Sequence, residues 1–109
     1  MTQAIDPKGF DRLARETLDH ILQALDELDP DLVEAVPSDG VVKLEFQGQR
    51  RPWVVNSQSA AQQIWLAAEQ RAWHFARDGE RWVAEKTQEE LFATLTGLLR
   101  EHVGIEVEL

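Results

Sequence analysis

The sequence contains no cysteine, and this absence excludes several classes of site. Disulfide bonds, thiolate-held metals and a cysteine nucleophile are impossible, so any bound metal must be held by oxygen and imidazole groups. No run of about 18 apolar residues exists that would span a bilayer. The first ten residues lack the basic and apolar segments of a signal or transit peptide. We therefore expect a cytoplasmic protein that does not cross a membrane.

Positive charge is scarce in one part of the chain. The 109 residues carry a formal net charge of −9, and the window from Glu16 to Asp39 holds eight acids and no Lys or Arg. A surface of this kind repels phosphate backbones and attracts cations or basic protein surfaces. Nucleic-acid binding is therefore disfavoured.

The motifs of common catalytic sites are missing as well. The sequence has no Ser/His/Asp arrangement, no HExxH motif, no P-loop and no glycine-rich dinucleotide motif. Paired carboxylates are expected only on a convex helix face, where no pocket can position a substrate. The residues therefore do not indicate an enzyme.

The chain length fits one domain over residues 1–109. Asp6 as a cap and Pro7 at the first position predict a helix, which Asp29-Pro30-Asp31 ends. Apolar residues recur along it every three or four positions, as one buried stripe requires. The stripe comprises Phe10, Leu13, Ala14, Thr17, Leu18, Ile21, Leu25 and Leu28.

The middle of the chain alternates short apolar segments with turn signals, which predicts an antiparallel meander. We expect turns at Pro37–Gly40 and at Asp78-Gly79, and a loop over Gln47–Arg51. The expected strands are Leu32–Val36, an edge strand, followed by Val41–Phe46, Trp53–Val55, Gln63–Ala68, Arg71–Ala76 and Arg81–Ala84.

A second helix is predicted from Thr87, where Thr87 and Glu90 fit a capping box, to a stop at Gly104. We expect the tail Ile105–Leu109 to pack along the body of the domain. The predicted class is α+β: a two-layer α/β sandwich in which an antiparallel sheet of about six strands carries both helices on one face. The other face is then free to meet solvent or a partner.

The strand Gln63–Ala68 divides its side chains between the two faces. Ile64 and Leu66 suit the core, which leaves Gln63 and Trp65 on the helix-free face. Trp65 is then either a recognition element or a structural ring packed against Trp53 or another side chain of that face. Three further residues also allow two interpretations each. His74 joins this face if Trp73 and Phe75 point inward, and the amides of Asn56 and Gln58 either satisfy turn backbone or contact a partner.

The first helix also carries a line of acids. Asp19, Gln23, Asp26 and Glu27 share one helical face, and Asp29, Asp31 and Glu34 continue the negative surface. Carboxylate oxygens suit iron, manganese and calcium ions, although an ordinary solvated helix face looks the same in sequence. The remaining polar candidates are histidines. His20 lies beside Asp19 and one turn from Glu16, and it is either a nitrogen ligand of a metal or a solvated side chain. His102 is expected to be an ordinary surface residue near a helix C-terminus.

One segment resembles a known family. Asn56-x-Gln58 followed by Gln63-Ile64-Trp65-Leu66 resembles the signature of the frataxins. Three other stretches agree, so that the resemblance spans Phe10 to Gly104. These are Phe10-x-x-Leu13-Ala14-x-x-Thr17-Leu18, Asp39-Gly40-Val41-Val42-x-Leu44-x-Phe46, and Trp73-His74-Phe75 with Trp82, which is similar to the bacterial CyaY type.

The resemblance implies an iron-binding protein that modulates iron–sulfur cluster assembly by docking on a cysteine desulfurase and its scaffold protein. It implies weakly held Fe²⁺ or Fe³⁺, with other divalent cations possible, in a chain that is monomeric unless iron drives oligomers. Iron storage with weak ferroxidase activity, or a metal-free acidic adaptor for basic protein surfaces, are the alternatives. The implied metal residues are Glu16, Asp19, His20, Asp26, Glu27, Asp29, Asp31 and Glu34; the implied partner residues are Asn56, Gln58, Gln63, Trp65 and His74.

Overall fold

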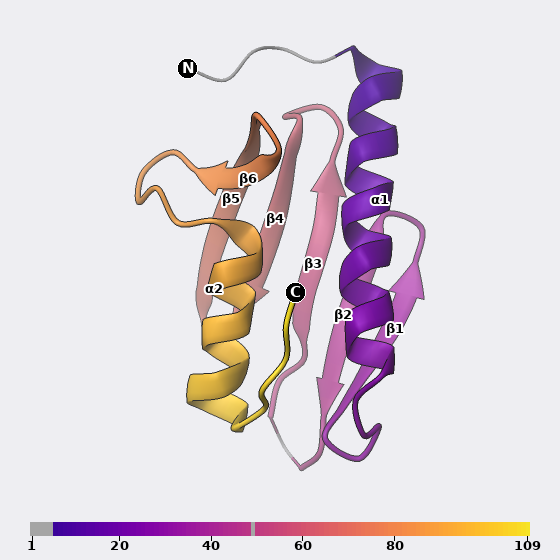
Figure 1. Cartoon of the computed structure of the whole chain (residues 1–109), viewed down its shortest axis with the longest axis vertical. Coiled ribbons are helices and arrows are strands. Elements are labelled where there is room, and N and C mark those ends of the chain that lie inside the picture. The colour runs from indigo at the N-terminus through magenta and orange to yellow at the C-terminus, as the bar shows by residue number, and fades with distance from the viewer. Residues whose placement is uncertain (1–5, 49) are drawn as a thin grey trace.

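The computed structural model describes residues 6–48 and 50–109 and has two layers (Figure 1). An antiparallel sheet of six strands forms one layer, and helices α1 (Pro7–Asp26) and α2 (Leu91–Leu98) lie side by side on one face of it. The predicted α+β sandwich is therefore confirmed. The predicted loop between the second and third strands is also present, except that Gln49 lies outside the described residues.

Helix α1 begins as the sequence predicts. The Asp6 carboxylate accepts hydrogen bonds from the backbone N–H groups of Lys8 (2.9 Å) and Gly9 (3.1 Å), and Pro7 occupies the first position. The helix ends at Asp26, before Leu28, because the Leu28 N–H bonds back to the Leu25 carbonyl and tightens the chain. Its predicted stripe is buried or half-buried throughout. Within residues 6–48 and 50–109, neither helix is long and apolar enough to cross a bilayer.

The strands follow one another across the sheet in chain order. They are β1 (Val33–Ser38), β2 (Val41–Phe46), β3 (Trp53–Gln58), β4 (Gln63–Ala68), β5 (Arg71–Asp78) and β6 (Arg81–Ala84), each antiparallel to its neighbours.

Three strands run further than the sequence predicts. β1 continues through Pro37 and Ser38, so the predicted Pro37–Gly40 turn shrinks to Asp39 and Gly40. Pro37 is tolerated because β1 is an edge strand, where a missing N–H need not cost a ladder bond. Gly40 adopts φ +72°, which favours glycine in this tight turn. β3 extends from Trp53 to Gln58 because its last residues pair with β4. β5 continues to Asp78 because its last two residues pair with β6, so the turn predicted at Asp78-Gly79 lies at Gly79 and Glu80 instead.

The core lies between the sheet and the helices. A buried hydrogen bond crosses it: the Trp82 indole N–H donates to the Thr17 hydroxyl at 2.8 Å, which joins β6 to α1. The largest fully buried side chains are Phe10, Ile21, Leu25, Leu44, Trp53, Ile64, Leu66, Phe75, Trp82, Leu91, Leu95 and Leu99.

The start of the second helix differs from the prediction. α2 begins at Leu91, and the Glu90 carboxylate caps it by accepting from the N–H groups of Phe92 (2.8 Å) and Ala93 (3.0 Å). The predicted start and capping box at Thr87 are wrong because Gln88 adopts φ +62°, which is incompatible with a helix. The segment before Glu90 is held instead against β6, where the Ala84 N–H donates to the Glu89 carbonyl.

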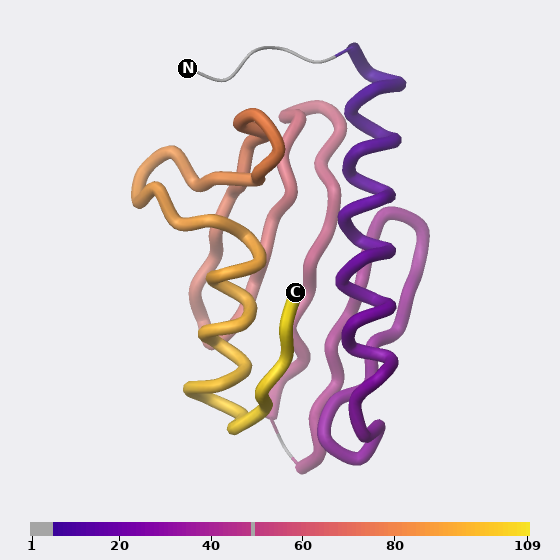
Figure 2. Tube along the Cα trace, in the orientation of Figure 1, coloured from indigo at the N-terminus to yellow at the C-terminus, as the bar shows by residue number. Residues whose placement is uncertain are grey.

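The end of the chain fills the space between the helices. A π-helical turn, Leu99–Val103, continues α2, and Gly104 in the left-handed conformation ends it as predicted. The tail then runs back between α1 and α2 (Figure 2). Ile105 is buried, and Val107 and Leu109 pack half-buried against the core, which confirms the predicted packing of the tail.

Candidate functional site

The sheet face opposite the helices carries the first candidate site (Figure 1). Ile64 and Leu66 are fully buried on the core side, as predicted. Trp65 therefore points to the outer side, where Asn56 of β3 and His74 of β5 are its cross-strand neighbours. Trp73 and Phe75 are buried, so His74 does belong to the outer face.

Trp65 is held in one orientation by its neighbours. Its ring stacks on the His74 imidazole with a centroid separation of 4.3 Å and an interplanar angle of 15°. Its indole N–H donates to the Gln63 side-chain oxygen at 2.8 Å. Trp53 plays no part, because it is buried in the core against Phe46. The result is a half-buried, oriented aromatic ring on the face of the sheet that neither α1 nor α2 covers.

Asn56 and Gln58 lie in the strand rather than in the turn after it. Asn56 is paired with Trp65, and Gln58 is paired with Gln63. Both amides are half-buried, and neither makes a hydrogen bond to the part of the chain that the structure describes. They add unused donors and acceptors beside the oriented ring. We call Asn56, Gln58, Gln63, Trp65 and His74 together the outer-face patch.

The acids of α1 and the following loop form the second candidate site. We call them the acidic ridge, which consists of Glu16, Asp19, Asp26, Glu27, Asp29, Asp31 and Glu34. All of them are exposed. In residues 6–48 and 50–109 no three or more Asp, Glu or His side chains converge as a metal site. The ridge is thus a series of separate carboxylates rather than a preformed cage.

His20 has partners in the helical layer. Its Nε2 lies 3.3 Å from the main-chain oxygen of Leu109, and its ring lies beside Phe92 with a centroid separation of 5.1 Å. No ion pair joins it to Glu16 or Asp19 in the described residues. The structure therefore places His20 against α2 and the tail.

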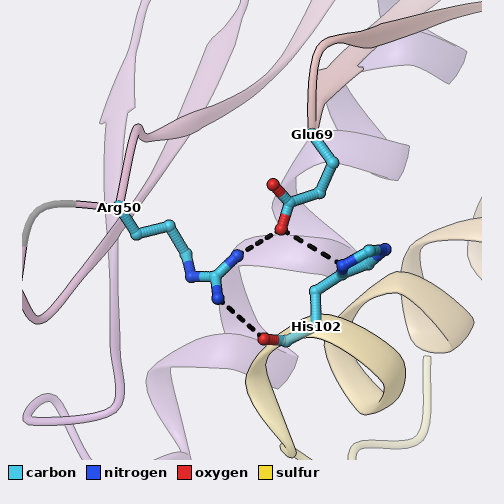
Figure 3. Close-up of polar contacts among 3 residues, drawn as sticks. All are labelled: Arg50, Glu69 and His102. Atoms are coloured by element: carbon cyan, nitrogen blue, oxygen red, sulfur yellow. Dashed lines mark hydrogen bonds and ion pairs between the residues drawn. The ribbon is translucent and has the colours of Figure 1, made fainter.

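A third polar cluster was not predicted (Figure 3). The Arg50 guanidinium pairs with the Glu69 carboxylate and donates to the His102 carbonyl oxygen at 2.9 Å. His102 is exposed in the last turn of the final helix, as predicted, but its Nδ1 lies 3.4 Å from the same Glu69 oxygen, so it has a partner that the sequence does not indicate. The cluster joins the β2–β3 loop, the β4–β5 turn and the end of the last helix. Because Arg50 lies 19 residues from Glu69 and 52 from His102, no local spacing signals it.

Comparison with known sequences identifies the family. The model of the frataxin-like domain matches residues 3–105. The iron-sulfur cluster assembly protein CyaY of Herminiimonas arsenicoxydans is 38% identical over 103 residues, with 92% of each chain covered. The protein of the same name from Cupriavidus necator is 36% identical over 104 residues, again with 92% of each chain covered.

Solved structures agree with this result. A frataxin from Psychromonas ingrahamii superposes with a TM-score of 0.86 over 95% of this chain and 97% of its own, and its 20% identity supports the fold alone. A trimeric yeast frataxin complexed with ferrous iron gives a TM-score of 0.74 at 27% identity, over 96% of this chain and 92% of its own. The chain therefore belongs to the frataxin family, and within that family it is of the bacterial CyaY type.

Proposed function

We propose that this chain acts in the cytoplasm as a modulator of iron–sulfur cluster assembly. In this proposal it docks on a cysteine desulfurase and its scaffold protein through the outer-face patch, and it holds iron weakly on the acidic ridge. The CyaY relatives, which are named as iron-sulfur cluster assembly proteins, support the pathway. The observation that carries the docking role is the oriented Trp65 ring on the helix-free face.

The outer-face patch has the physical properties of a binding hot spot. Tryptophan is enriched among the residues that dominate interface energies. The stack on His74 and the hydrogen bond to Gln63 restrict the ring before binding, which lowers the entropy lost on association. The free amides of Asn56 and Gln58 supply directional contacts next to it. A chain that docks in this way changes the rate of sulfur transfer without performing chemistry itself.

The docking proposal is tested by binding to purified desulfurase, alone and with scaffold. We expect Trp65→Ala to weaken binding by about 30-fold or more, the effect of losing a hot-spot residue. Phe92→Ala is the matched control because it removes a half-buried aromatic ring from the helical layer. Wild-type affinity in a folded Trp65→Ala protein would refute docking through this face.

The iron proposal rests on charge density rather than on a cage. Separate exposed carboxylates favour hard cations but do not fix a coordination geometry. Binding should therefore be weak, distributed over several positions and reduced by salt. The ferrous complex of the yeast frataxin supports iron as the cation to test first.

The proposed iron binding on the acidic ridge is tested by titrating Fe(II) anaerobically and following the amide resonances of the protein. We expect the signals of Asp19, Asp26, Glu27 and Asp31 to broaden or shift. The triple variant Asp26→Asn, Glu27→Gln, Asp31→Asn should lose most of this response. The control triple variant Glu80→Gln, Glu101→Gln, Glu108→Gln changes charge equally at exposed positions outside the ridge and should keep it.

The outcome also separates the alternatives. An unperturbed ridge with intact desulfurase binding would point to a metal-free acidic adaptor. Oxygen-dependent Fe(II) consumption above background, together with iron-dependent oligomers, would point to storage and ferroxidase activity.

A further inference from the structure

A cleft of about 530 Å³ lies at one end of the sheet, between the β2–β3 loop and the β4–β5 turn. Arg50, Arg51 and Arg71 line it, which is three of the chain's 11 Lys and Arg residues. Glu69 is the one carboxylate among its lining residues. The cleft is thus a positive region on a chain whose net charge is −9.

The three guanidinium groups differ in how they are engaged. Arg50 is occupied by Glu69 and the His102 carbonyl (Figure 3). Arg71 lies over the Trp73 ring at 4.4 Å from its centroid, which orients the group, and it forms no ion pair with any residue in 6–48 or 50–109. Arg51 is exposed and makes no ion pair within the described residues. Because Arg50 neutralises Glu69, Arg51 and Arg71 are available to an anion.

One residue that lines the cleft, Trp53, carries an unsatisfied donor. Trp53 is 1% exposed, and its indole N–H is the one buried side-chain polar group without a partner in residues 6–48 and 50–109. The other three indoles donate to Gln63, Glu89 and Thr17. A buried N–H without an acceptor is costly, so a small shift of the ring that let this N–H reach an acceptor oxygen in the cleft would be stabilising.

We propose that this cleft binds a small oxyanion that carries more than one negative charge, of the phosphate or carboxylate class. Guanidinium groups bind both kinds of oxyanion through paired N–H···O bonds, and two of them can engage two edges of one anion. The volume falls within the roughly 300–1,000 Å³ of small-molecule sites. The site shares no residue with the outer-face patch or the acidic ridge, so it is independent of the function proposed above.

The test is a titration with pyrophosphate and, separately, with citrate, at constant ionic strength set by chloride. We expect the Trp53 indole resonance and the amides of Arg51 and Arg71 to shift along one saturating curve. The tighter of the two anions identifies the class. Arg51→Gln and Arg71→Gln should each weaken binding about tenfold or more, as expected for loss of a charge-assisted hydrogen bond.

Arg81→Gln is the matched control because Arg81 is an exposed strand residue outside the cleft. It should change the affinity by less than about twofold, since exposed charges more than a Debye length away are largely screened. An unmoved Trp53 indole resonance would overturn the proposal, as would equal weakening by Arg81→Gln. Neither of these results would contradict the separate proposal that the chain docks through Trp65.

Discussion

Thr17 is the buried polar side chain of the described core, and its hydroxyl makes two hydrogen bonds. It donates to the Leu13 carbonyl at 2.8 Å and accepts from the Trp82 indole N–H, also at 2.8 Å. The first bond is local to α1, whereas the second joins residues 65 positions apart. Trp82 is 1% exposed, so its N–H has no access to water in place of Thr17. This hydroxyl therefore adds a directional contact between α1 and β6 to the packing of Phe10 against the Trp82 ring.

Thr17→Val should lower the free energy of unfolding by about 1–3 kcal/mol, because the isosteric methyl leaves the Trp82 N–H unpaired. Urea denaturation measures the effect, and Thr17→Ser should recover most of the loss. Thr94→Val is the matched control, since the half-buried Thr94 hydroxyl donates only within its own helix, to the Glu90 carbonyl. Equal losses in both variants would contradict the special role of the Trp82 bond.

The C-terminal tail acts as an element although it has no regular secondary structure. It enters after Gly104 and runs between the two helices (Figure 2). Ile105, Val107 and Leu109 face the core, while Glu106 and Glu108 are exposed. The main-chain oxygen of Leu109 lies within hydrogen-bond distance of His20 of α1, so the tail links α2 to α1. The helices are thus held side by side through the tail.

Replacing Val107 and Leu109 together by serine should destabilise the protein by about 2–3 kcal/mol, because two half-buried side chains lose their apolar contacts. Amide exchange near His20 and Phe92 should accelerate if the tail detaches. Glu108→Ser changes the exposed position between them and should have little effect. A double variant as stable as Glu108→Ser would show that the tail does not hold the helices.

Charge is distributed unevenly over the whole molecule. The acids between Glu16 and Asp39 are all exposed, and no Lys or Arg lies among them in the sequence. The three arginines at the cleft are drawn from two other segments of the chain. Like charges crowded on one surface repel each other, and salt screens this repulsion. Stability should therefore depend on ionic strength and on bound cations.

Neutralising Asp26, Glu27 and Asp31 should raise the free energy of unfolding by about 1 kcal/mol at low ionic strength, because several like-charge contacts of a few tenths each are removed. The gain should shrink in concentrated salt, where the Debye length is about 3 Å. Denaturation at two salt concentrations measures it. The triple variant of Glu80, Glu101 and Glu108 should gain less, and an equal gain would mean that net charge, not its clustering, matters.

Most elements were predictable because their signals are local. The Asp6 cap, the stripe of α1, the alternation in β2 and β4 and the Gly104 stop each depend on neighbours within a few residues. The same locality explains why the sequence predicts Ile64 and Leu66 in the core and Trp65 on the other face. The family signature at Asn56–Leu66 is likewise contained in one short segment.

Contacts between distant segments set the remaining features. Nothing near Trp53 or Trp65 says that one is buried beside Phe46 while the other stacks on His74. α2 starts later than the sequence predicts because the residues before it are hydrogen-bonded to β6. His102 has partners because three separate segments of the chain meet at Glu69. Short-range periodicity sets which face of an element is apolar. The partners of each exposed polar group depend on packing, since they are contributed by other elements.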